Sequence, residues 1–382
     1  MSTDNQQQLA ALRSQIDGVD TELVQLLAKR RELTTRIGDI KQQLGEPLYV
    51  PSREAALIEA RREQASALQL NPDLIEDVLR RLIRESYRNQ EHRSAKQFGD
   101  ASRPIIIVGG AGQLGQLFVR LFQTSGYQVQ VVDKTSSEAI AWQQAQLVLV
   151  SVPIAVTESV IANLPILADD CVLADVTSIK AAPLAAMLKQ HGGPVVGLHP
   201  MFGPQVPNLA KQLVVVCAGR KAEQYGWLLQ QLENWGAVLQ AVPAVEHDER
   251  MAFVQVLRHL STFVYGDHLA QEGIKIDELL SVSSPIYRLE LMMVGRLFAQ
   301  NASLYADIIL ANPTNLAMVS RYLKQFQQVL KGLQAGDREG FIKRFEALQQ
   351  FFGHHGQQFL RESQQLLQTA DDLRQPTLQQ RL

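Results

Sequence analysis

The pattern of hydrophobic and polar positions divides the chain into three regions. In residues 9–44 apolar side chains recur at spacings of three and four with no intervening proline, which predicts one long amphipathic helix. Ser52 stands where it can cap a second helix over residues 52–68. A third helix is predicted from about residue 72 to residue 90. The first region is therefore an all-helical module.

The second region follows a polar, aperiodic stretch, residues 91–103, that is typical of a linker. Short apolar runs then alternate with helical stretches. The runs are residues 105–108, 129–132, 147–150, 171–174, 195–198 and 213–217. This alternation predicts an α/β domain with a parallel, doubly wound (Rossmann) sheet.

The third region begins near residue 245, where strand signals end. Long periodic stretches at residues 251–270, 286–300 and 316–366 predict a second all-α domain. A length of 382 residues allows two or three domains. The predicted domains are residues 1–96, 103–243 and 244–382.

Composition excludes several classes of protein. A net charge of -2, with no basic excess in the first hundred residues, argues against a nucleic-acid partner. The sequence has no apolar signal-peptide core and no apolar stretch long enough to span a membrane. The two cysteines, Cys171 and Cys217, have apolar neighbours, which excludes a disulfide framework and a CxxC metal site. We therefore expect a cytoplasmic protein without a bound metal.

A glycine fingerprint, G-x-G-x-x-G, follows the first apolar run and opens a predicted helix. It consists of Gly110, Gly112 and Gly115, with Gln113 and Leu114 inside it. Glycines at these positions permit a tight turn, close approach of a pyrophosphate and close helix packing. Asp133 ends the next strand, where an acid binds ribose hydroxyls and repels a 2′-phosphate. The pattern favours NAD over NADP, although Lys134 beside the acid leaves some use of NADP open.

The segment VVGLHPMFGP places His199 near the carboxyl end of a later strand, in a loop stiffened by two prolines. Doubly wound sheets bind ligands at this edge. Among the eight histidines, His199 is therefore the best candidate for a base, with a structural role as the alternative.

Two groups of motifs resemble known enzyme families. GLHPMFGP, together with SSPIYRLELMMVGRLFAQN further on, resembles the prephenate dehydrogenases. LRSQIDGVDTELVQLLAKR, YVPSREA and RESYRNQ resemble the AroQ-type chorismate mutases. In this order, and over essentially the whole chain, they resemble the bifunctional chorismate mutase–prephenate dehydrogenases. The resemblance implies that chorismate, prephenate and NAD are the ligands and that L-tyrosine is a feedback inhibitor.

For the dehydrogenase, the resemblance implies that His199 accepts the proton of the prephenate ring hydroxyl. Hydride then passes to NAD, and loss of carbon dioxide gives 4-hydroxyphenylpyruvate. Arg296 lies in an apolar helical stretch, so either an anionic ligand or an internal acid must balance its charge. The resemblance assigns Arg296 to prephenate, whereas the role of Arg288 stays open. Further implied site residues are Ser178, which orients the histidine, and Lys180, His247 and His259.

The mutase reaction is a pericyclic rearrangement without proton transfer, so its site needs cations more than bases. The cations implied are Arg13, Arg30, Lys41 and Arg53, with Glu54, Ser86 and Gln90 as hydrogen-bonding partners. A solvated helix face is the alternative reading of these charges. Val50 departs from the family pattern, because other members often have an acid there.

Helix geometry predicts a homodimer. Arg30 and Lys41 lie eleven residues apart, ~16 Å along one helix face, and can approach one ligand from both ends. Arg13 lies seventeen residues before Arg30, ~25 Å away and rotated by ~100°. If Arg13 serves the same site, it must come from a second subunit whose long helix packs antiparallel to the first.

Two other functions fit parts of the pattern. One is an arogenate dehydrogenase, or a β-hydroxyacid dehydrogenase with a similar helical domain. The other is a helical N-terminal module that only mediates association. The sequence identifies no effector pocket for tyrosine and no path for passing prephenate between two sites.

Overall fold

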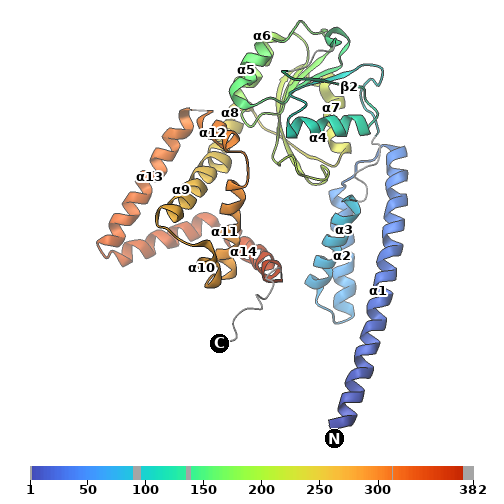
Figure 1. Cartoon of the computed structure of the whole chain (residues 1–382), viewed down its shortest axis with the longest axis vertical. Helices are drawn as coiled ribbons and strands as arrows, with labels where there is room; N and C mark the ends of the chain where they lie inside the picture. Colours follow the sequence, from blue (N-terminus) through green and yellow to red (C-terminus); the bar gives the residue numbers. More distant parts are fainter. Residues whose placement is uncertain (1, 89–95, 135–138, 312, 373–382) are drawn as a thin grey trace. The chain divides into compact units, whose positions relative to one another are not determined.

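The computed structural model describes residues 2–88, 96–134, 139–311 and 313–372. The chain forms two compact units, residues 1–247 and residues 248–382 (Figure 1). The first unit contains the N-terminal helices together with the sheet, and the second is helical. The predicted order of an all-α region, an α/β doubly wound region and an all-α region is confirmed. The three predicted domain boundaries stay a prediction, because the first two regions share one unit.

Three helices form the N-terminal module: α1 (Ser2–Leu44), α2 (Pro51–Ala67) and α3 (Pro72–Arg88). Figure 1 shows α2 and α3 beside the C-terminal half of α1, whose N-terminal half extends beyond them. Gly45, with a φ of 70°, follows the last residue of α1. No helix in the described ranges is long and apolar enough to cross a membrane.

The start of α2 differs from the prediction. Ser52 does not cap it: the N-cap residue is Val50, which makes no side-chain capping bond, and Pro51 occupies the first helical position. Proline is favoured there because its fixed φ suits the helix and the N–H that it lacks would have no helical partner. The third helix does have a side-chain bond at its start, from the Asp73 N–H to Asn71 Oδ1 at 3.0 Å.

The sheet has seven strands in the order β2-β1-β3-β4-β5-β6-β7. They are β1 (Ile105–Val108), β2 (Val129–Val132), β3 (Leu147–Val150), β4 (Val172–Asp175), β5 (Val195–Pro200), β6 (Leu213–Arg220) and β7 (Val238–Ala241). All six predicted strands are present. The missed strand β7 is a short edge strand whose residues are largely exposed, so its sequence lacks the apolar run of a buried strand.

The predicted parallel, doubly wound sheet has one antiparallel pair of strands. Strands β1 to β5 pair in parallel, but β6 runs antiparallel to β5, and β7 is parallel to β6. The connection from β5 to β6, residues 201–212, contains no helix. A parallel pair needs a longer crossover, usually helical, whereas an antiparallel pair does not.

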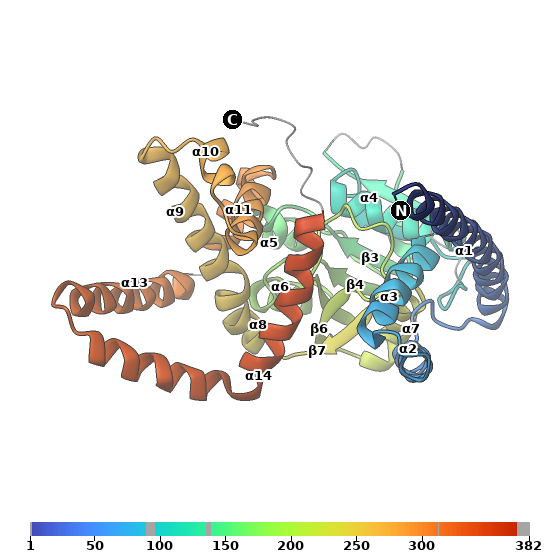
Figure 2. The same cartoon turned by 90° about the horizontal axis from the view of Figure 1, so that it is seen from below.

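Helices cover both faces of the sheet (Figures 1 and 2). On one face α4 (Gln113–Thr124) and α7 (Ala222–Asn234) pack against the strands. On the other face lie α5 (Ile154–Ala162) and α6 (Ala181–Gln190). Because both faces are covered, successive residues of β1 all lie in a core, alternating from one face to the other.

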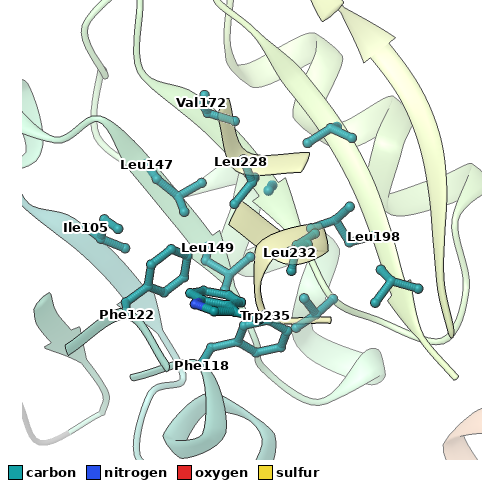
Figure 3. Close-up of a cluster of buried hydrophobic side chains, with 14 of the residues drawn as sticks. Ile105, Phe118, Phe122, Leu147, Leu149, Val172, Leu198, Leu228, Leu232 and Trp235 are labelled. Carbon is teal, nitrogen blue, oxygen red and sulfur yellow. The ribbon is translucent and has the colours of Figure 1, made fainter. Parts of the chain in front are cut away.

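Large aromatic side chains fill the core under α4 and α7 (Figure 3). The Phe122 ring meets Trp235 edge to face, with centroids 4.8 Å apart, and Tyr127 in the same way at 5.6 Å. The Trp235 indole N–H donates to Ser125 Oγ at 2.9 Å. This core fixes α4, and with it the glycine loop at the N-terminus of that helix.

The second unit is built from helices. Its elements are the end of α8 (Ala244–Met251), a π-helix η2 (Ala252–Leu257), α9 (Arg258–Gln271), α10 (Ile276–Ser281), α11 (Pro285–Phe298), α12 (Ala302–Leu310), α13 (Pro313–Gln334) and α14 (Arg338–Asp372). A short 3₁₀ turn, η1 (Trp142–Gln144), belongs to the first unit. The predicted stretch 316–366 is broken at two glycines. Gly336, with a φ of 72°, separates α13 from α14, and Gly353, with a φ of 49°, interrupts α14 with a kink.

Candidate active sites

The glycine loop joins β1 to α4 at the carboxyl edge of the sheet, where β1 lies between β2 and β3. The backbone makes its tight turn at Gly109, whose φ is 84°, and not at Gly110, the first glycine of the fingerprint. A Cβ on Gly110 would lie 2.8 Å from Val131 Cγ1, and one on Gly115 would lie 2.3 Å from the Gly109 carbonyl oxygen. Gly110 and Gly115 are thus needed for close packing, and Gly109 for the turn.

The loop meets the predicted acid. The Ala111 N–H donates to Asp133 Oδ2 at 2.8 Å, so the end of β2 and the glycine loop are directly bonded. Gln113 and Leu114 begin α4, with Gly112 as the N-cap residue. The first N–H groups of a helix have no helical acceptor and attract a phosphate. A loop without bulky side chains, a helix N-terminus and an acid beside it fit the pyrophosphate and ribose of NAD.

His199 lies in β5 and is only 2% exposed. Its Nδ1 shares a hydrogen bond with His247 Nε2 at 2.7 Å, and the two rings meet edge to face with centroids 5.0 Å apart. Burial lowers the pKa of His199 well below its usual 6.5, and the charges of Lys180 and His247 lower it further. His199 is therefore neutral near pH 7, the state in which an imidazole can accept a proton.

A buried ion pair lies next to His199. Lys180 and Asp175 are both 0% exposed, and the Lys180 ammonium pairs with Asp175 Oδ2. The same ammonium donates to the Leu198 carbonyl oxygen at 2.6 Å, one residue before the histidine. In this position Lys180 acts on His199 through its charge. Direct contact of Lys180 with substrate stays a prediction, and this buried conformation does not provide it.

Ser178 lies in the same segment and is half-buried. In the part of the chain that the structure describes, its side chain makes no hydrogen bond to His199. The partner of His199 Nδ1 is His247 instead. The orienting role predicted for Ser178 therefore stays a prediction.

In the second unit, Arg296 stands in the last turn of α11 and is exposed, whereas Leu291 and Val294 of that helix are buried. Within the described ranges no carboxylate pairs with Arg296. The sequence argument that this guanidinium is buried among apolar side chains is thus wrong for the single chain. Arg288 is half-buried on the same helix.

His259, on α9, is also half-buried. Its ring lies edge to face with Tyr305, with centroids 4.8 Å apart. Burial, and secondarily the charge of Arg258, lowers the pKa of His259 to about 4. His259 is therefore a neutral side chain near pH 7.

In the N-terminal module, Arg30 bridges two helices. Its Nη1 donates to Ser86 Oγ at 2.9 Å and to the Leu82 carbonyl oxygen at 3.3 Å, joining α1 to α3. Burial lowers the pKa of Arg30. Lys41, on the same helix, donates to the Pro47 carbonyl oxygen at 3.1 Å. Burial lowers the pKa of Lys41 too, opposed by the charge of Glu46.

Glu54 is 8% exposed on α2. Its Oε2 accepts a hydrogen bond from the Tyr87 hydroxyl at 3.1 Å, and its Oε1 pairs with the Lys211 ammonium. Arg80 lies 3.9 Å from the same oxygen. Sequence reasoning selected Glu54 but missed Lys211, which lies 157 residues away, because no local signal links the two.

Arg13 and Arg53 are not brought to this site in the single chain. Arg13 is exposed on the N-terminal half of α1, and Arg53 is exposed at the start of α2. Gln90 lies outside the described residues. In a single chain the structure therefore brings together Arg30 with Ser86, and Glu54 with Lys211.

The fold and the two groups of residues define a class. The chain is a dinucleotide-dependent dehydrogenase preceded by a helical module that carries half-buried cations. Three family models match it in order: chorismate mutase type II over residues 12–91, the nucleotide-binding domain of prephenate dehydrogenase over residues 121–241, and the dimerization domain of prephenate dehydrogenase over residues 243–347.

Similar proteins identify the family. The T-protein of Enterobacter agglomerans is 51% identical over 374 residues, covering 96% of this chain and 99% of that protein. The T-protein of Haemophilus influenzae is 48% identical over 371 residues, covering 96% and 98%. The chain belongs to the T-protein family: it is a bifunctional chorismate mutase and NAD-dependent prephenate dehydrogenase of tyrosine biosynthesis.

A solved structure shares the fold of the last two regions. Prephenate dehydrogenase from A. aeolicus, in complex with hydroxyphenyl propionate and NAD+, superposes with a TM-score of 0.54 and 17% identity. The match covers 65% of this chain and 96% of that one.

Proposed function

We propose that His199 is the general base of the dehydrogenase. The observation that carries the proposal is a neutral, buried imidazole at the carboxyl edge of the sheet, with one ring nitrogen held by His247 at 2.7 Å. His247 fixes the orientation of the ring. A base placed in this way typically contributes ~10² to 10⁴ in rate.

The bonds that break on prephenate, and the proton that His199 accepts, account for the reaction. The C4 hydroxyl of prephenate gives its proton to His199, the C4 hydrogen leaves as hydride, and the C–C bond to the ring carboxylate breaks to release carbon dioxide. The electron pair of that C–C bond makes the ring aromatic, and the resulting phenolate oxygen takes a proton back to give 4-hydroxyphenylpyruvate. NAD, when bound, accepts the hydride. The glycine loop and Asp133 would hold the cofactor through its pyrophosphate and ribose. Arg296 binds a carboxylate of prephenate. Its guanidinium is exposed and pairs with no carboxylate among the described residues, which supports this role.

Replacing the base tests this assignment. In His199→Asn we expect NAD affinity to be unchanged and kcat with prephenate to fall ~10²-fold or more, because asparagine cannot accept the proton. Equilibrium titration with NAD and steady-state kinetics with prephenate measure the two effects. An unchanged kcat would contradict the role of His199.

In the mutase, Arg30 and Lys41 hold the two carboxylates and the ether oxygen of chorismate in a compact conformer. Their positions on one face of a continuous α1 and their partial burial support this, because a half-desolvated cation interacts more strongly with an anion. Ser86 orients Arg30 through their 2.9 Å hydrogen bond. Glu54 accepts a hydrogen bond from the ring hydroxyl of chorismate.

A second copy of the chain completes the mutase. Apolar residues along α1 are each more than half exposed: Leu12, Ile16, Val19, Leu23 and Leu26. A stripe of this kind on a helix favours packing against another helix. An antiparallel copy of α1 covers the stripe and brings its Arg13 to the site of Arg30. The homodimer has two equivalent mutase sites.

Two further properties, inhibition by tyrosine and the cellular compartment, are inferred from the family and not from the geometry of the sites. L-Tyrosine acts as a feedback inhibitor. The protein works in the reducing cytoplasm, which the two free, buried cysteines support. Inhibition of NADH formation by added tyrosine tests the first property directly.

A further inference from the structure

The mutase residue Glu54 is contacted by a residue of the nucleotide-binding region. Lys211 stands near the end of the loop that joins β5 to β6, and its ammonium pairs with Glu54 Oε1. The same loop follows directly after β5, the strand that carries His199. Glu54 and Lys211 both belong to the first compact unit.

The backbone at Lys211 is held in an unusual conformation. Its φ is 65°, in the left-handed region that L residues other than glycine rarely adopt. The Lys211 N–H donates to the Gly236 carbonyl oxygen at 2.9 Å. Gly236 itself has a φ of 96°, and a Cβ there would lie 2.9 Å from Ala210 Cα. These contacts thus fix the position of the Lys211 backbone.

Further hydrogen bonds join the helical module to the sheet region around this contact. Asn208 Nδ2 donates to the Tyr87 carbonyl oxygen at 3.0 Å. The Leu48 N–H donates to the Asn234 carbonyl oxygen at 3.1 Å, and Asn234 Nδ2 lies 3.3 Å from the carbonyl oxygens of both Gly45 and Glu46. These bonds hold the sheet region that carries Lys211 against the helical module that carries Glu54.

The groups facing Glu54 show why this lysine matters. From α3 come the Tyr87 hydroxyl, which donates at 3.1 Å, and Arg80, whose Nη1 is 3.9 Å away and whose side chain is half exposed. Tyr49, in the loop before α2, lies under the Lys211 ammonium, 5.3 Å from ring centroid to Nζ. Lys211 is therefore the cation in closest contact with a carboxylate that is almost fully buried.

We propose that Lys211 is a positioning residue of the mutase, which keeps Glu54 ionised and oriented toward chorismate. An ionised carboxylate can accept a hydrogen bond from the single ring hydroxyl of chorismate with either oxygen. Protonation turns one of the two oxygens into a donor. A buried carboxylate without a nearby cation becomes easier to protonate. The nucleotide-binding region thereby completes the mutase site. This inference rests on the proposed role of Glu54.

The test uses the full-length protein and the pH dependence of the mutase. In Lys211→Met we expect the acid limb of mutase kcat/KM to move up by about 1 to 3 pH units, because the opposite charge is removed. Lys211→Arg should keep most of the parent profile. Dehydrogenase kinetics with prephenate should not change, which also shows that the variant is folded.

Lys221→Met is the matched control. The backbone of Lys221 is also in the left-handed region, with a φ of 53°, and this residue precedes α7 in the same unit. Its charge acts on His191. We expect both activities of this variant to match the parent. A parallel loss of both activities in the Lys211→Met variant would overturn the proposal, as would an unshifted mutase profile.

Glu54→Gln separates the inference from the assignment on which it rests. Glutamine has no proton to lose, so Lys211→Met should not shift the acid limb further in this background. Glu54→Ala removes the acceptor altogether. If Glu54→Ala leaves mutase kinetics unchanged, the role of Glu54 is wrong. If Glu54→Ala impairs the mutase but Lys211→Met does not, only the role of Lys211 is wrong.

Discussion

His199 shows how burial prepares a single residue for its chemistry. An exposed histidine would be partly protonated near neutral pH, and the protonated fraction could not accept a proton. Burial, the Lys180 ammonium and His247 each lower the pKa of His199. The Lys180–Asp175 pair is itself fully buried, so it places a fixed positive charge near the base without exposing either side chain to solvent.

The acid limb of the pH profile of the dehydrogenase depends on the protonation of His199. A base with a lowered pKa remains neutral as the pH falls through 6.5 and becomes protonated only at a lower pH. We therefore expect kcat/KM for prephenate to stay level through pH 6.5 and to decline below it. A pH profile of the full-length enzyme measures this, and an acid limb above pH 6.5 would contradict the neutral state of His199.

Sequence alone predicted residue identities better than residue contacts. His199 and the glycines follow from motifs with a physical meaning, and the structure places them at the expected sheet edge. The turn at Gly109 was missed because the fingerprint begins one residue later. The Lys211–Glu54 pair has no sequence signal, since it depends on how two regions pack.

At the scale of elements, α1 has the most direct functional consequence. Its C-terminal half packs beside α2 and α3 (Figure 1), whereas its N-terminal half presents exposed leucine, isoleucine and valine side chains. Arg30 and Lys41 lie on this one helix, and Arg13 lies too far along it to join them. The helix α1 therefore carries both the cations of the proposed mutase site and the apolar surface of the proposed dimer.

Complementation tests this arrangement. Arg13→Ala and Arg30→Ala homodimers should each lose most mutase activity. When equal amounts are unfolded and refolded together, half of the dimers contain both variants, and each has one intact site. Mutase activity should then return to about a quarter of the parent value. No recovery in the mixture, with dimers formed, would contradict an Arg13 supplied by the second subunit.

Element prediction succeeded where the sequence pattern is repeated and failed where it is short. The long periodic stretch of α1 and the six apolar runs all correspond to elements of the expected type. Strand β7 is a short, exposed edge strand without that pattern. The antiparallel pairing of β5 with β6 depends on the missing crossover helix between them.

At the scale of the whole molecule, the chain joins two reactions that share prephenate as product and substrate. The helical module and the sheet region belong to one compact unit, and the hydrogen bonds around Lys211 connect them. The near-zero net charge fits small dianionic substrates, because a few placed cations are enough to bind them.

One chain performs both reactions, at two distinct sites. The most direct test of this follows NADH formation by the purified full-length protein, with NAD and either chorismate or prephenate. We predict NADH from both substrates in the parent. In Arg30→Ala we predict NADH from prephenate at the parent rate and almost none from chorismate. Parent-like NADH formation from chorismate in that variant, or no NADH from prephenate in the parent, would contradict the account.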